Sequence, residues 1–178
     1  MEYVIDVQGF KSHGNKFIFK EVALISLAEK VPSVYLFKPP HAFMRHSPTN
    51  RASVRWLEKN YHRLKWSRGD IDCSELDITL LRALRDAQNV YVKGADKVQW
   101  LRKYSSEIID LETVGCPALY KLQRLPACAH HSLIIDAECA CESNVLALKE
   151  WLNNVLPTER TPIERDGDIP DSWCIHNR

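Results

Sequence analysis

The sequence lacks three features that would each point to a different class of protein. Its apolar runs are far shorter than the roughly 20 residues that span a bilayer, so we expect no membrane contact. Its formal net charge is only +1, which excludes a polymer-binding protein that is basic throughout. Residues 1–6 enter a strand-like pattern at once, with no signal-peptide pattern, so we expect an intracellular protein, cytoplasmic or nuclear.

The length of 178 residues is enough for one domain with a core that needs no disulfides. At 45% hydrophobic and 26% charged residues, the composition is that of an ordinary globular protein. We expect the domain to cover residues 1–156. Residues 157–178 have three prolines and little apolar periodicity, which predicts an extended tail that can dock protein partners.

The cysteines are unevenly spread, and an intracellular protein keeps them reduced. Cys73 and Cys174 stand apart in the sequence. The other four gather near two histidines: Cys116, Cys128, Cys139, Cys141, His130 and His131. Zinc is held tetrahedrally by Cys and His side chains, and a first pair separated by two residues can bind one ion without strain. Cys128 and His131 have that spacing, with Cys139 or Cys141 following.

A second interpretation of the same segment is catalytic. His131 and Asp136 form an H-x4-D pattern just before an apolar helical repeat. That arrangement resembles the last motif of an exonuclease. The segment therefore predicts either a structural metal site or part of a catalytic centre.

The periodicity of apolar residues predicts an α/β fold with a mixed sheet. Three N-terminal strands at short spacing suggest an antiparallel meander, and the later elements alternate between helix and strand. The expected strands are 3–7, 17–27, 34–37, 89–92 and 106–111. The expected helices are 53–62, 75–88 (with Asp77 as a cap), 96–104, 118–125 and 140–155. This order of elements is typical of an RNase H-like domain.

Several segments then show a resemblance to the DEDDh exonuclease superfamily. Tyr3-Val-Ile-Asp-Val-Gln8 resembles its D-x-E motif on the first strand, Val90 to Asp96 lies where its second motif stands, and His131-x4-Asp136 resembles its third. The resemblance implies a 3′–5′ exonuclease in which Asp6, Asp96 and Asp136 hold two Mg²⁺ or Mn²⁺ ions.

The first motif departs from that pattern, because Gln8 stands where the second carboxylate is expected. An amide brings no charge and is a poor bridging ligand for two metal ions. Lys93-Gly94 also replaces the His-Asn that the family usually carries. Two-metal catalysis is therefore the less favoured interpretation, although a partial site remains open.

The chain is more similar to the Maelstrom domain, a relative of these exonucleases that lost the carboxylates. That family has a Glu-Cys-His-Cys zinc motif, and the matching residues here are Glu21, Cys128, His131 and Cys139. Cys141 is an alternative last ligand, but Cys139 is preferred because Cys141 belongs to the apolar face of the following helix. Glu21 interrupts an apolar strand, where a carboxylate is costly to bury unless a cation or donor meets it; the alternative is that it faces solvent. Four protein ligands imply a closed, structural zinc site.

Residues 45–68 form a basic segment in an otherwise balanced chain. It has seven arginines and lysines and one acid, Glu58, with Trp56, Tyr61 and Trp66 between them. Cations with interleaved aromatic rings suit single-stranded nucleic acid; the alternative is a solvated helix face with Trp56 and Tyr61 in the core. Arg51, Arg55, Lys59 and Arg63 recur every four residues and predict one continuous stripe. The candidate contacts are Arg51, Arg55, Lys59, Arg63, Lys65 and Arg68.

Three functions follow. The first is a single-stranded RNA-binding domain with structural zinc. For this function the Maelstrom resemblance implies a role in small-RNA-guided transposon silencing. It also implies metal-independent ribonuclease activity, by a residue that the sequence does not identify. The second is an active, divalent-metal-dependent exonuclease. The third is a protein-interaction scaffold on an inactive nuclease fold, with residues 157–178 as its docking arm.

Overall fold

A computed structural model describes residues 1–11, 16–122 and 140–156, and these form an α/β domain around a five-stranded mixed sheet. The strand order is β3-β2-β1-β4-β5. The strands are β1 (Glu2–Lys11), β2 (Phe17–Ser26), β3 (Ser33–Leu36), β4 (Asn89–Val92) and β5 (Ile108–Asp110). The predicted α/β class and the predicted strand pattern are confirmed: β1, β2 and β3 are antiparallel, and β4 and β5 join in parallel.

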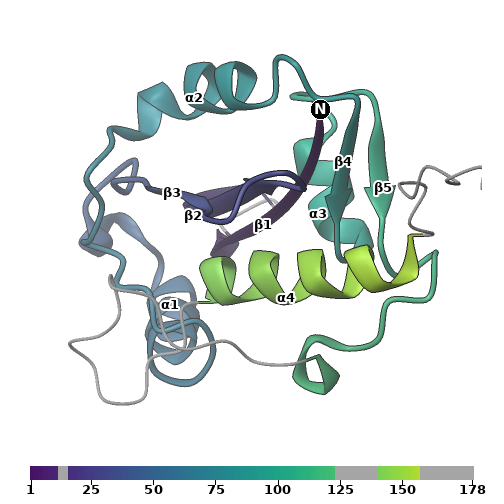
Figure 1. Ribbon diagram of the computed structural model, residues 1–178. Coiled ribbons are helices and arrows are strands. Elements are labelled where there is room, and N and C mark those ends of the chain that lie inside the picture. The colour runs from purple at the N-terminus through teal and green to yellow at the C-terminus, as the bar shows by residue number, and fades with distance from the viewer. Residues whose placement is uncertain (12–15, 123–139, 157–178) are drawn as a thin grey trace, which may run out of the picture.

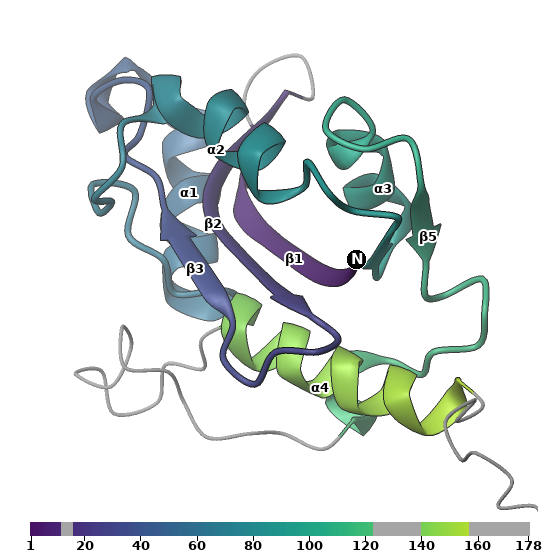
Figure 2. The same ribbon diagram turned by 45° about the horizontal axis from the view of Figure 1, so that its top comes forward.

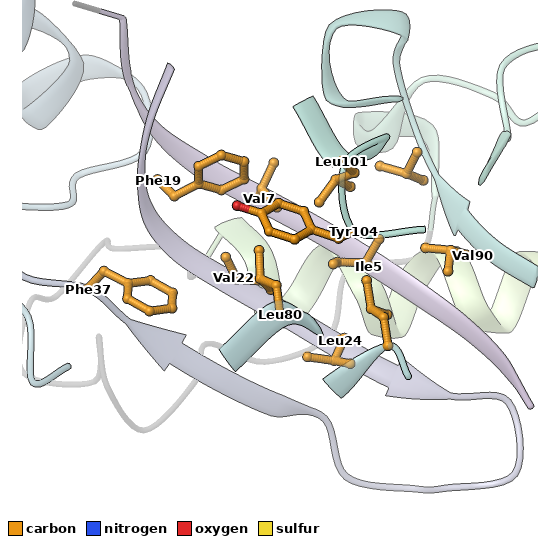
Figure 3. Packing of buried hydrophobic residues seen from close by; sticks show 12 residues of the cluster. Ile5, Val7, Phe19, Val22, Leu24, Phe37, Leu80, Val90, Leu101 and Tyr104 are labelled. Atoms are coloured by element: carbon orange, nitrogen blue, oxygen red, sulfur yellow. The ribbon is translucent and has the colours of Figure 1, made fainter. Parts of the chain in front are cut away.

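Helices cover both faces of the sheet (Figure 1). They are α1 (Pro48–Asn60), α2 (Leu76–Ala83), α3 (Ala95–Leu101) and α4 (Ala140–Val155). On one face, α2 and α3 pack on Ile5, Val7 and Val22, and Figure 3 shows this cluster. On the other face, α4 packs on Val4 and Ala23. No helix among the described residues combines the length and the apolar character needed to cross a bilayer.

Helix α4 shows how directly the apolar pattern sets the packing. Cys141, Val145, Leu148 and Leu152 recur on one helical face, and all four are buried against the sheet. Their burial is the reason why this side of the helix faces the sheet (Figure 1). The prediction of this helix from residues 140–155 is confirmed.

Three predicted helices are shorter in the structure, and one of them is the predicted 96–104 helix, which is α3. The predicted 75–88 helix is α2, and Asp77 does not cap it: its Oδ1 accepts hydrogen bonds from Lys103 and Tyr104, each at 2.7 Å. Where a helix was predicted from residue 118, the described residues form only the 3-10 turn Leu119–Lys121, after which Leu122 is extended. That turn is enough to pack Leu119 and Leu122 near α4, so a longer helix is not needed for burial.

Strand β1 is the centre of the fold and is irregular near its end. Its pairing with β2 shifts at Gln8 and Gly9, so that Lys20 has no partner on β1. A Cβ atom at Gly9 would lie 2.0 Å from the backbone oxygen of Ile18, so only glycine permits this approach. The buried Lys20 ammonium donates to the carbonyls of Phe37 and Arg68, and burial lowers its pKa to about 8.

Candidate functional site

The second half of β1 extends beyond its parallel neighbour and forms one side of a cavity. Pairing with β4 covers only Glu2–Val4, so residues 5–11 continue past the end of β4. Helix α1 lies on the β2–β3 side of this projecting half and α3 on the β4–β5 side (Figure 2). A pocket of about 850 Å³ is lined by residues of β1, α1, the start of β2 and the β4–α3 junction. Ends of parallel strands are the usual place for ligand sites in such sheets.

Asp6 lies beneath this pocket with no exposed surface. Alternation along β1 puts it on the same face as Val4, which packs against α4. Its carboxylate accepts a hydrogen bond from Lys97 Nζ on α3 and another, at 2.7 Å, from Asn144 Nδ2 on α4. Three elements distant in sequence therefore meet at one buried carboxylate.

Lys97 is the charged partner that makes the burial of Asp6 tolerable. Burial disfavours the Lys97 ammonium, but the Asp6 carboxylate outweighs that effect, so the pKa of Lys97 lies above its usual value. Its side chain is 17% exposed and lines the pocket, whereas Asp6 does not. The pocket wall therefore holds an ammonium group that is backed by a carboxylate.

The predicted metal-binding carboxylates Asp6 and Asp96 have different surroundings. Asp96 lies on the pocket wall with 66% of its side chain exposed, and its Oδ2 pairs with Lys11 Nζ at 3.2 Å. Asp6 is enclosed and bound by Lys97 and Asn144. Asp136, the third predicted carboxylate, lies outside the described residues.

Aromatic rings form two walls of the pocket. Trp56 and Tyr61, from α1 and its C-terminal cap, are 58% and 63% exposed, which rules out their interpretation as core residues. Phe17 and Trp100 stack on each other, with ring centroids 3.7 Å apart and planes inclined by 5°. Trp66, by contrast, is buried against Phe10.

The predicted basic stripe is interrupted. Arg51, Arg55 and Lys59 are on α1, but the helix ends at Asn60, and Arg63 follows with a φ of 57°. The prediction of a four-residue stripe is wrong at Arg63. The reason is tertiary: His62 donates from Nε2 to the Gly9 carbonyl at 3.1 Å, which holds the chain against β1 instead of in a further helical turn.

The cations of the pocket are not those of the stripe. Lys11, Lys93 and Lys97 line it, and the candidate contacts Arg51, Arg55, Lys59, Arg63, Lys65 and Arg68 are not part of that lining. Arg55 instead lies over the ring of Phe43, at 5.4 Å. Lys65 and Arg68 follow α1 and are exposed, and the Arg68 carbonyl accepts from Lys20. The chain thus has a cationic helix face and, separately, a pocket that carries ammonium groups.

Of the predicted zinc ligands, Glu21 alone is described. It is buried on β2, so the interpretation of Glu21 as a solvent-facing residue is wrong. The Glu21 backbone carbonyl lies 3.7 Å from the Cys141 thiol. Cys141 is in the first turn of α4, and Cys139 comes just before this helix in the sequence. Cys128, His131 and Cys139 lie outside the described residues. The described residues contain no group of three or more His, Cys, Asp or Glu side chains that could hold a metal ion together.

Cys141, the alternative last ligand, has no exposed surface and packs among Val4, Val145 and Leu148. An interior position in an apolar cluster is typical of a structural cysteine. Cys141 is therefore already part of the core, and Cys139 as the last ligand of a zinc site stays a prediction.

The sequence interpretation missed Lys97, Asn144, Trp100 and Phe17. One signal was available for the first of them: Lys97 directly follows Asp96 at a helix start. A helix turns about 100° per residue, so a small rotation of the helix decides whether Asp96 or Lys97 points toward Asp6. Asn144 carried no such signal, because its position depends on how α4 packs across the sheet.

Comparison with known proteins found no matching family model and no significant match among curated protein sequences.

Proposed function

We propose that this protein is a single-stranded RNA-binding domain of RNase H-like, Maelstrom type, with a structural zinc site and no working two-metal centre. The observation that carries the proposal is the pocket beside β1, where exposed aromatic rings stand next to lysines. Rings that stack bases and cations that meet phosphates are the two elements of single-strand recognition. The strand order β3-β2-β1-β4-β5, with β2 antiparallel to its neighbours, supports the RNase H-like assignment.

The surroundings of Asp6 favour binding over two-metal hydrolysis. A two-metal site needs several carboxylates that converge on the ions. Here Lys97 and Asn144 bind both oxygens of Asp6, and Asp96 is paired separately with Lys11. Recruiting Asp6 to a divalent ion would first require breaking its buried ion pair, which is costly.

Binding of a labelled single-stranded RNA, measured by fluorescence anisotropy from 50 to 300 mM salt, tests the proposal. We expect the affinity to fall with salt, because phosphate contacts release counterions. The double variant Arg55→Glu, Lys59→Glu should bind at least about 10-fold more weakly at low salt, since it reverses two exposed charges of α1. Lys30→Glu, an exposed lysine of the β2–β3 connection, is the matched control. Absence of salt-sensitive binding at low ionic strength would contradict the proposal.

Metal analysis tests the zinc site independently of RNA. Glu21, Cys128, His131 and Cys139 would hold the ion and tie the β2 strand to the start of α4, as folding-coupled zinc does in small domains. We expect about one equivalent of zinc in the purified protein. Cys128→Ser and Cys139→Ser should lose it, and Cys141→Ser and the control Cys73→Ser should retain it. Loss of zinc from Cys141→Ser with retention in Cys139→Ser would reverse the ligand assignment.

A further inference from the structure

The pocket combines lysines with aromatic rings, and the rings are not needed for a general electrostatic affinity for RNA. A surface that only attracts phosphates needs cations, whereas this cavity of about 850 Å³ also has aromatic rings on two walls. Its volume lies within the range of about 300–1,000 Å³ that is common for small-molecule sites. The cavity is therefore large enough to enclose a group of small-molecule size, and its use need not be limited to contact with an RNA backbone.

The aromatic walls are suited to a flat ligand. Phe17 and Trp100 stack in parallel and both line the cavity, together with Trp56 and Tyr61 on the α1 side. More than half of the surface of the residues Trp56 and Tyr61 is exposed, although large rings gain free energy when they are buried. A nucleobase offers the flat surface that such rings stack on.

Two of the three pocket lysines pair with carboxylates that lie outside the cavity. Lys97 pairs with Asp6, and Lys93 Nζ lies 3.2 Å from Glu112 Oε1; neither carboxylate lines the cavity. Asp96 is the one carboxylate in the lining, and Lys11 pairs with it. The lining therefore has three lysines and one carboxylate, a balance that suits a phosphate.

We propose that the pocket takes one unpaired nucleotide of the RNA, with its base against the aromatic walls and its phosphate at the Lys97 ammonium. In this arrangement the Lys97 ammonium donates a further N–H to the phosphate while it stays paired with Asp6, and no divalent ion takes part. Asp6 and Asn144 are positioning residues, because they fix the Lys97 ammonium through buried hydrogen bonds. The inference rests on the proposed function, since it assigns a role to the pocket within single-strand RNA binding.

Two variants separate stacking from phosphate contact. Trp56→Ala should weaken binding of a single-stranded RNA on the order of 10-fold, with the salt dependence unchanged, because it removes a stacking surface and no charge. Asp6→Asn combined with Lys97→Met keeps the net charge and removes the ammonium. The negative slope of log affinity against log salt should become less steep by about 0.7, the value for one single-strand phosphate contact.

The controls make each outcome decisive. Tyr120→Ala removes a ring that is 70% exposed and outside the pocket, and it should bind like the wild type. A blunt duplex of the same sequence should bind more weakly than the single strand, because its bases are paired and stacked. Thermal unfolding of each variant shows whether it folds. If Trp56→Ala does not fold, Tyr61→Ala tests stacking in its place. If the Asp6→Asn, Lys97→Met variant does not fold, Asp6→Asn with Lys97→Gln tests the charge in its place.

The results distinguish the pocket from the wider function. If the wild type binds RNA with salt dependence but both pocket variants match it, the pocket assignment is overturned and the proposed function stands. If the duplex binds as tightly as the single strand, the unpaired nucleotide is overturned. If the wild type binds no RNA at any salt concentration, the proposed function fails and the pocket assignment fails with it.

Discussion

Replacing Lys97 with methionine is expected to lower the free energy of unfolding by about 3–5 kcal/mol, because it leaves the Asp6 carboxylate buried without its cation. Asp6 has no exposed surface, and its remaining side-chain partner is the Asn144 amide. An amide hydrogen bond does not compensate for the burial of a full charge. Chemical denaturation of the wild type and the variant at pH 7 measures this difference.

A double-mutant cycle identifies the ion pair as the cause. Adding Asp6→Asn to Lys97→Met removes the stranded charge, so the double variant should recover most of the lost stability. Lys11→Met is the matched control: it breaks the pair with Asp96, whose two side chains are 62% and 66% exposed, and should cost less than about 1 kcal/mol. An equally small effect of Lys97→Met would mean that Asp6 is not a desolvated carboxylate in solution.

Acidification from pH 6.5 to pH 4 is expected to remove up to about 3 kcal/mol of stability through His62 alone. His62 is buried, with Nε2 donating to the Gly9 carbonyl and Nδ1 accepting from the Leu64 amide at 3.1 Å. Burial lowers its pKa to about 4, although the bond to Gly9 opposes the shift. Between pH 6.5 and 4 the unfolded chain binds a proton that the folded chain does not, so stability falls as the pH falls.

His62→Gln isolates this contribution, because glutamine does not titrate. The difference in unfolding free energy between wild type and variant should shift by up to about 3 kcal/mol across the window. Burial also lowers the pKa of His46, helped by His41 and Arg51, but this effect is common to both proteins and cancels. Asp72 and Asp77 have lowered pKa values and lose their contributions only at lower pH. A constant difference from pH 6.5 to 4 would show that His62 does not titrate in this way.

The fold was predictable where one residue pattern decides the outcome. Alternating and continuous apolar runs located β1, β2 and β4, and apolar periodicity predicted the length of α4 and its apolar face. Most residues of these strands are buried, and α4 buries one continuous apolar face, so hydrophobic patterning alone specifies them.

The candidate site was less predictable because it depends on contacts between distant residues. Asp6 was identified from its strand motif, but its partners Lys97 and Asn144 follow 91 and 138 residues later. The end of α1 depends on the bond between His62 and Gly9, which are 53 residues apart. Local periodicity carries no information on such contacts, so the basic stripe was extended one turn too far and the pocket lysines were overlooked.

The order of the strands has a consequence for self-association. The two edges of the sheet are β3 and β5, which have only four and three residues, whereas the ten-residue strands β1 and β2 lie inside (Figure 2). Beyond β3, Phe37 already pairs with Ile71 in a parallel bridge. Short edge strands give a second molecule few backbone groups to pair with. The first residues of β1 and the middle of β2 are thereby kept away from the edges at which sheets join into aggregates.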